Sequence, residues 1–163
     1  HLYIHGAKAS RLLKALTEGE ACVTIALADG LVLARSAMHH SLNYRSVVIY
    51  GRFALVTDPV EKQRSLQALI EGLYPGRWET LRPINDKELN ATSVLRIPLA
   101  EASAKVRDMG AVDDEEDLAW PVWAGVIPLN TATGMPRREG DSVGRTVPAT
   151  RFSVGSDTAG GAV

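Results

Sequence analysis

The chain has 163 residues, of which 45% are hydrophobic and 23% charged, a composition typical of one globular domain with a sizeable core. Its formal net charge of −1 offers no broad electrostatic surface to nucleic acid or to an anionic membrane, and no apolar run is long enough to cross a bilayer. We therefore expect neither partner. Cys22 is the only cysteine, which favours a cytoplasmic location; its apolar surroundings predict a small buried side chain rather than a catalytic thiol.

The first segment, HGAKASRLLKAL, predicts the end of a strand at His5, a tight turn at Gly6 and then a helix. Helical spacing predicts that one face of this helix packs inward, and that face consists of Ala9, Leu12, Leu13 and Leu16.

The opening turn of this helix carries two cations and a hydroxyl, at Lys8, Ser10 and Arg11. Cations are unfavourable there because the positive end of the helix dipole lies at the N-terminus. A bound phosphate would explain them. An ordinary solvated helix start is the alternative, and the local sequence does not separate the two.

The next pattern predicts a β-hairpin. Strands are expected at Ala21–Ala28 and Leu31–Ala37, joined by the two-residue loop Asp29-Gly30. The polar run MHHSLNYRS follows, and then a long β-branched strand at Ser46–Val56.

Two capped helices are predicted next. Asp58 and Pro59 open the first, and its buried face is expected to be Leu66, Leu69, Ile70 and Leu73. Asn85 and Glu88 have capping spacing, which predicts a short helix at Asp86–Ala91.

The remaining elements are short. A strand that bears Pro98 near its end, as an edge or terminal strand would, is expected at Val94–Leu99, and Glu101–Met109 should be partly extended. The acidic run Asp113–Asp117 is interpreted as solvated, and Ala124–Leu129 is the last strand. The composition of Thr131–Val163 predicts a mostly disordered tail. Together these elements indicate a mainly β domain, a small barrel or sandwich, with helical additions.

Common catalytic signatures are missing: GxGxxG after a strand, GxxxxGK[ST], HExxH, GxSxG and paired CxxC. His39 and His40 could ligate a metal or a haem. Adjacent residues on a strand point to opposite sides, so we predict no metal site and interpret the pair as a polar loop or a site lining. Trp120 and Trp123 could stack on a flat ring, although packing in a core or interface is the expected role.

The ordered set of motifs resembles the pyridoxamine 5′-phosphate oxidase-like, flavin-nucleotide-binding family, close to the branch with nitroimidazole-resistance proteins. The set is HGAKASRLLKAL, the Asp-Gly pair, HHSLNYRSVVIYGRFALV, DPVEKQRSLQALIE and PVWAGVIPL. The resemblance implies a split β-barrel (α+β) at residues 1–130, followed by the tail. It also implies FMN as cofactor and a homodimer. Family members carry further strands before the position of His1, so the barrel is expected to be N-terminally incomplete.

The resemblance also implies the binding residues. The phosphate-binding turn would be His5, Gly6, Lys8, Ser10 and Arg11. The second binding segment would be Ser36, His40, Asn43, Tyr44, Arg45 and Ser46.

Two function classes follow from these expectations. The first is a flavin-dependent oxidoreductase that acts on an unidentified small molecule, with no catalytic residue assigned. The second is a non-catalytic flavin- or haem-binding protein for storage or sensing. Haem and a deazaflavin are the alternative cofactors.

Overall fold

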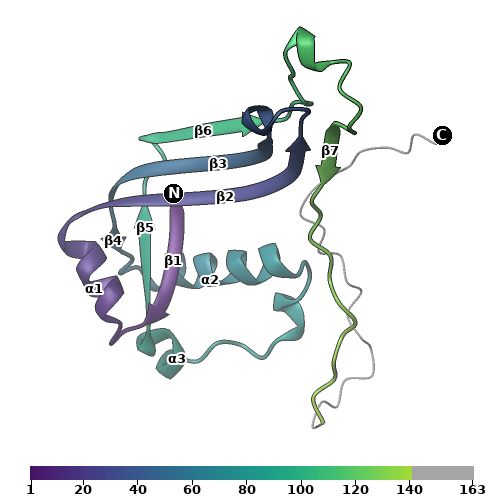
Figure 1. Ribbon diagram of the computed structural model, residues 1–163. Coiled ribbons are helices and arrows are strands. Elements are labelled where there is room, and N and C mark those ends of the chain that lie inside the picture. Colours follow the sequence, from purple (N-terminus) through teal and green to yellow (C-terminus); the bar gives the residue numbers. More distant parts are fainter. Residues whose placement is uncertain (141–163) are drawn as a thin grey trace. The chain divides into compact units, whose positions relative to one another are not determined.

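The computed structural model describes residues 1–140, which Figure 1 shows as a coloured ribbon. They form two compact units: His1–Leu27 with Arg45–Val106, called here the first unit, and Ala28–Tyr44 with the described residues from Arg107 onward, called the second unit.

The described chain is mainly β with helices at the connections, as predicted. The regular elements are β1 (Leu2–Ala7), α1 (Arg11–Glu18), β2 (Glu20–Leu33), β3 (Ser41–Arg52), β4 (Ala54–Leu55), α2 (Pro59–Leu73), α3 (Asp86–Ala91), β5 (Thr92–Ile97), β6 (Ala102–Arg107) and β7 (Gly125–Pro128). Single 3₁₀ turns lie at Ala37–His39, Trp78–Thr80 and Glu115–Asp117. The strands make two sheets, ordered β1-β5-β4 and β6-β3-β2-β7.

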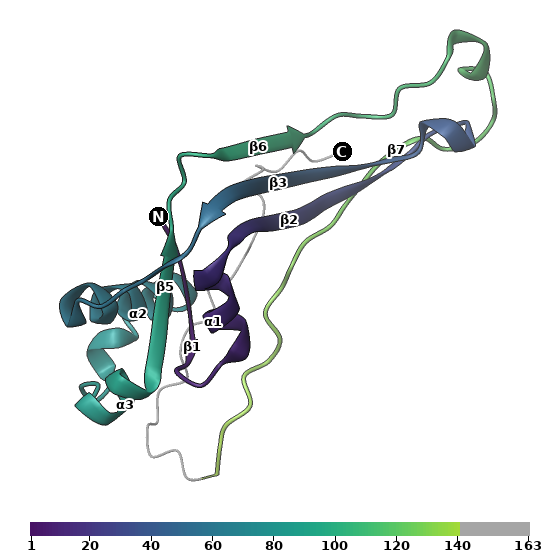
Figure 2. The same cartoon turned by 90° about the vertical axis from the view of Figure 1, so that its left-hand side faces the viewer.

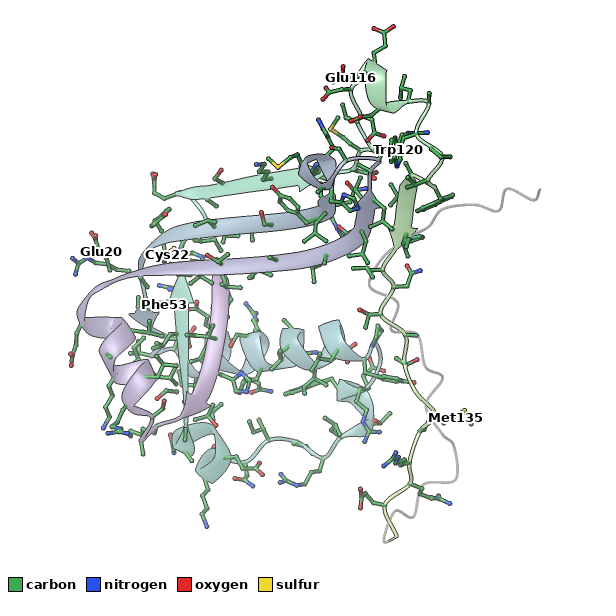
Figure 3. The ribbon with its side chains drawn as sticks, in the orientation of Figure 1. Glu20, Cys22, Phe53, Glu116, Trp120 and Met135 are labelled. Carbon is green, nitrogen blue, oxygen red and sulfur yellow. The ribbon has the colours of Figure 1, made fainter. Side chains whose placement is uncertain are left out.

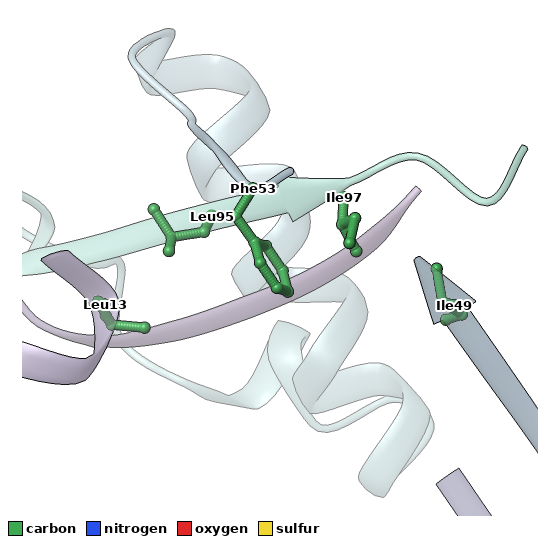
Figure 4. Close-up of a cluster of buried hydrophobic side chains, with 5 residues drawn as sticks. All are labelled: Leu13, Ile49, Phe53, Leu95 and Ile97. Carbon is green, nitrogen blue, oxygen red and sulfur yellow. The ribbon is translucent and has the colours of Figure 1, made fainter. Parts of the chain in front are cut away.

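The core of the first unit lies on one face of the β1-β5-β4 sheet. It consists of Leu13, Ile49, Phe53, Leu95 and Ile97, which Figure 4 shows gathered beside β1 and β5. β1 pairs antiparallel with β5, from Leu2 opposite Ile97 to Ala7 opposite Thr92. Alternate side chains of both strands therefore point into this core, including Leu2 and Ile4.

The other face of the same sheet carries α2. The Tyr3 hydroxyl donates to Glu61 of α2 at 3.0 Å, and the Arg96 guanidinium donates to the same carboxylate at 2.6 Å. Figure 2 shows α1 and α2 on opposite sides of β1 and β5. Side chains at odd positions of β1 therefore face α2, and those at even positions face the core.

Helix α1 buries less than its apolar spacing predicted. Leu13 is 7% exposed and Leu16 packs against the core, whereas Leu12 is 68% exposed. Ala9 precedes the helix and is exposed. The expected four-residue inward face is therefore wrong for Ala9 and Leu12.

The predicted Asp-Gly hairpin is also wrong, because β2 runs without a break through both residues. A two-residue type I′ loop needs φ > 0 at both central positions, and Gly30 does not have it. Gly30 instead pairs with Pro128 of β7, and a Cβ on it would lie 2.9 Å from Val126 Cγ1. The chain reverses later, at the 3₁₀ turn between β2 and β3.

Both capped helices begin where predicted. The Asp58 carboxylate accepts from the amides of Val60 and Glu61, and Pro59 is the first residue of α2. The expected burial of the apolar face of α2 is wrong, because Leu69 is 40% and Leu73 55% exposed.

Three further expectations about burial or position are corrected. Cys22 is exposed on β2 (Figure 3), because strand alternation turns it away from the core against which its neighbours Ala21 and Val23 pack. Trp120 and Trp123 are mostly exposed, which excludes packing in a core of the described residues, while the interface role stays a prediction. β5 is the central strand of its sheet and ends at Ile97, just before Pro98.

The described part of the predicted tail, residues 131–140, is exposed throughout. Residues 141–163 lie outside the described part, so the disordered tail stays a prediction. Within residues 1–140, no helix is both long and apolar enough to cross a membrane.

The cap of α3 gives a pH-dependent prediction. The Glu88 carboxylate pairs with Arg82 and accepts from the Asn85 amide at 3.1 Å, while the Glu88 amide donates back to Asn85 at 2.9 Å. The Arg82 hydrogen bond, followed by that of the Asn85 amide, lowers the pKa of Glu88 from 4.5 to about 2. A lowered carboxyl pKa stabilises the fold above pH 4.5, and this contribution is lost as the pH falls through 2.

We therefore expect Glu88→Gln, which keeps the capping geometry but removes the charge, to lower the melting temperature at pH 7 and to match the native protein near pH 2. Glu18→Gln, on the exposed end of α1, is the control, and its melting temperature should equal that of the native protein at both pH values. An equal deficit of Glu88→Gln at both pH values would contradict the assignment.

Candidate functional site

The turn between β1 and α1 is fixed by backbone contacts. The Lys8 amide donates to the Ala91 carbonyl at 2.8 Å, and the Ser10 amide donates to the Ala7 carbonyl at 2.8 Å. Gly6 lies against Leu13, where an added Cβ would be 3.0 Å from Leu13 Cδ1. The turn therefore holds the start of α1 in one position against β1 and β5.

The start of α1 presents unused donors beside cations. Ser10 is the N-cap residue, and its hydroxyl oxygen accepts from the Leu13 amide at 3.4 Å. The amides of Arg11 and Leu12 have no intrahelical acceptor, as at any helix start. No acidic residue lies in the first turn of α1, whereas α2 has one there and α3 has two. Lys8, Ser10 and Arg11 therefore all lie in the turn at the start of α1, and their role in binding stays a prediction.

A third cation lies close to this turn, and sequence reasoning missed it. The Lys62 ammonium, from α2, donates to the Leu89 carbonyl near the end of α3. Burial, and then the positive charge of Lys8, lower the pKa of Lys62. An anion at this position would relieve the repulsion between the two ammonium groups.

The second predicted segment begins at a turn closed by a buried ion pair. The Asp113 carboxylate accepts from the Arg35 amide at 2.7 Å and from its guanidinium at 2.8 Å, and its side chain is 1% exposed. Burial alone would raise the pKa of Asp113, but hydrogen bonds from Arg35 and from the Ser36 amide lower it. The expectation of a wholly solvated acidic run is therefore wrong at Asp113.

Ser36 and His40 lie at this turn. The Ser36 hydroxyl oxygen is buried and has no hydrogen-bond partner among the described residues. The Ser36 carbonyl lies 2.9 Å from His40 Nδ1. If Nδ1 carries the proton, Nε2 of the exposed His40 keeps its lone pair for a ligand. His39 instead contacts Asp114 through Nε2 at 3.3 Å.

Asn43 is buried and its amide is used within the chain. Its side-chain oxygen accepts from Arg107 at 2.7 Å and from the Met109 amide at 3.1 Å, and its nitrogen donates to the Met109 carbonyl at 3.0 Å. These bonds give Asn43 a structural role between β3 and the segment after β6.

The rest of the predicted polar cluster lies on β3, where alternation places Tyr44 and Ser46 on one face and Arg45 on the other. His5 to Arg11 belong to the first unit, as do Arg45 and Ser46, while Ser36 to Tyr44 belong to the second.

A pocket of about 740 Å³ opens in the first unit, and no motif in the sequence predicted it. It lies between α2, α3 and the segment after α2. Its lining residues are His5, Gln63, Leu66, Leu69, Ile70, Trp78, Glu79, Leu81, Arg82, Pro83, Ile84, Glu88 and Thr92. The apolar stripe of α2 is the available signal in the sequence, but its spacing alone predicts a buried core face. Among the described residues, no group of three or more His, Cys, Asp or Glu is arranged to hold a metal ion.

Two solved structures are similar to the chain over most of its length. The flavocytochrome Anf3 from Azotobacter vinelandii is 45% identical, with a TM-score of 0.81, over 91% of this chain and 69% of that chain. The FAD- and haem-binding protein from Mycobacterium smegmatis is 37% identical, with a TM-score of 0.83, over 90% of this chain and 73% of that chain.

A third structure, a candidate 5-nitroimidazole antibiotic resistance protein from Bacteroides thetaiotaomicron, is 16% identical with a TM-score of 0.50. It covers 63% of this chain and 58% of that chain, and at this identity the likeness concerns the fold alone. A comparison with curated proteins gave no match.

The family model described as pyridoxamine 5′-phosphate oxidase matches residues 1–106. This match and the structural likeness confirm the resemblance inferred from the motifs and the split-barrel fold class that it implied. The chain therefore belongs to the pyridoxamine 5′-phosphate oxidase family.

Proposed function

We propose that this protein binds a flavin nucleotide and that the flavin phosphate lies at the β1–α1 turn. The start of α1 supports this most directly, since Lys8 and Arg11 stand beside free helical amides with no carboxylate in the first turn. Amides, a hydroxyl and two cations together are the donor set that a phosphate monoester prefers. FMN is the cofactor expected from the sequence, and the similarity to the FAD- and haem-binding protein makes FAD its competitor.

The residues on β3 complete the proposal. Arg45 and Ser46 belong to the same unit as the turn: Ser46 can contact the flavin ring, while Arg45, on the other face of the strand, can reach an anion. A bound flavin would supply electron or hydride transfer to a small molecule. This chain's own residues would bind the phosphate, orient the ring and limit the access of water.

We also infer a homodimer. Several large apolar side chains of the first unit are exposed, and these are Leu12 (68%), Ile25 (44%), Leu27 (40%) and Tyr50 (60%). Exposed apolar surface of this kind is typical of a protein–protein interface.

The phosphate assignment predicts selectivity between FMN and riboflavin, which have the same ring. Charge-assisted hydrogen bonds contribute roughly 1.5–3 kcal/mol each. Lys8→Gln with Arg11→Gln should therefore weaken FMN binding by about tenfold or more and leave riboflavin binding unchanged. Fluorescence titration with both ligands measures this difference. Ser10 is kept, because its hydroxyl caps α1.

Lys14→Gln, which removes one positive charge a turn further along α1, is the control. Equal losses for FMN and riboflavin, or the same loss in the control, would contradict a phosphate at this turn.

An oxidoreductase and a storage or sensor protein differ in turnover. We expect NADH or NADPH to bleach the visible absorption of the bound flavin, and oxygen or a nitroaromatic compound to restore it. A bound flavin that neither NADH nor NADPH reduces would favour the storage or sensor alternative. A bound chromophore that shows neither the flavin spectrum nor the Soret band of haem would indicate a deazaflavin.

A haem site in addition to the flavin is a second proposal. Two similar proteins are a flavocytochrome and an FAD- and haem-binding protein. In this chain, the Ser36 carbonyl can fix the proton of His40 on Nδ1, and a backbone acceptor of this kind is what haem- and metal-ligating histidines generally have. His40 would hold the iron through Nε2.

His40→Ala should therefore abolish the Soret band of haem-reconstituted protein, while His39→Ala, the adjacent control, should retain it. An unchanged spectrum in His40→Ala would exclude His40 as the ligand. Flavin affinity is measured in the same samples and should not change in either variant.

A further inference from the structure

The pocket described above lies next to the phosphate-binding turn. His5 and Thr92 line it, and Thr92 is paired in the ladder with Ala7, the residue directly before Lys8. The Lys8 amide is bonded to the Ala91 carbonyl, the residue before Thr92. The end of β1 thus contributes to the pocket and leads straight into the cationic turn.

The positively charged side chains near the β1–α1 turn come from two helices, α1 and α2. Arg11 begins α1, whereas Lys62 belongs to α2 and donates to the end of α3. Lys62 adjoins Gln63, which lines the pocket. Within residues 1–140, no ion pair joins Lys8, Arg11 or Lys62 to a carboxylate. Two linked phosphates can contact cations on both elements, whereas a single phosphate is satisfied at the start of α1.

The walls of the pocket suit a flat base attached to a sugar. Leu66, Leu69 and Ile70 of α2 provide an apolar surface, and Trp78 provides an aromatic one. Bases stack on aromatic and apolar side chains of this kind. Gln63 supplies an amide that can hydrogen-bond with sugar hydroxyls or with the edge of the base.

Acidic side chains also line the pocket. Their negative charge disfavours a phosphate group inside it. Glu79 and Glu88 are both lining residues, and Glu88 is paired with Arg82. Their carboxylates can accept from ribose hydroxyls or from an exocyclic amine. The negative charge therefore belongs at the Lys8–Lys62 end, and the neutral part of the ligand belongs in the pocket.

We propose that this pocket binds the adenosine half of FAD, with the diphosphate bridging the β1–α1 turn and Lys62. The proposal rests on the proposed flavin function and extends it, because it makes FAD rather than FMN the preferred cofactor. The volume of about 740 Å³ lies within the range of small-molecule sites.

The test compares the dissociation constants of FAD and FMN in the full chain by fluorescence titration. The native protein should bind FAD about tenfold or more tightly than FMN. Leu69→Trp, which fills the pocket, and Trp78→Ala, which removes the stacking surface, should each abolish this preference and leave FMN affinity unchanged. Lys62→Gln, which keeps a donor for the Leu89 carbonyl, should reduce FAD affinity more than FMN affinity.

Leu73→Trp is the matched control, because Leu73 is exposed on the same helix but does not line the pocket. It should keep the preference for FAD. Unchanged melting temperatures establish that each variant is folded.

Equal affinities of the native protein for FAD and FMN would overturn the adenosine site and leave the flavin function intact. A preference for FAD that survives Leu69→Trp and Trp78→Ala would place the adenosine elsewhere and overturn the assignment. A folded native protein that binds neither flavin would overturn the proposed function itself.

Discussion

The start of α1 depends on the connection between β1 and β5. The Lys8 amide bonds to the chain just before β5, and Leu13, three residues into the helix, packs on the core beside Gly6. This arrangement leaves Arg11 and Leu12 little freedom to move away from Lys8. A set of donors held in advance binds an anion with a smaller loss of conformational entropy than a flexible loop would.

The alternation of β1 connects this turn to the two sides of the first unit. Leu2 and Ile4 point into the core, whereas Tyr3 and His5 face α2. One strand therefore fixes the helix start against the core and lines the pocket on the opposite face. The core stabilises the turn, while the α2 face remains open enough for a ligand.

Sequence reasoning succeeded where the signals are local. Asp58-Pro59 and the Asn85–Glu88 box satisfy orphan helix amides within four residues, and both helices begin there. The predicted helix at 86–91 matches the observed one, and the polar and charged residues at the start of α1 do lie together. The family motifs also gave the fold class correctly.

Sequence reasoning failed where a residue distant in the chain decides the local structure or the burial of a side chain. Asp29-Gly30 would suit a turn, but pairing with β7 keeps Gly30 in an extended strand. Asp113 is buried because Arg35, 78 residues away in the chain, neutralises it. The stripe on α2 indicated an apolar face correctly, but a hydrophobic pattern does not distinguish a core from an open pocket. Lys62 was missed for the same reason, since its proximity to Lys8 comes from tertiary structure.

A crystal structure of the protein soaked with its flavin is the most direct test of whether the β1–α1 turn binds the flavin phosphate. We expect phosphate oxygens within hydrogen-bonding distance of the Arg11 and Leu12 amides, with the Lys8 and Arg11 side chains in contact. A flavin bound with its phosphate away from this turn, and Lys8 and Arg11 facing solvent, would contradict it.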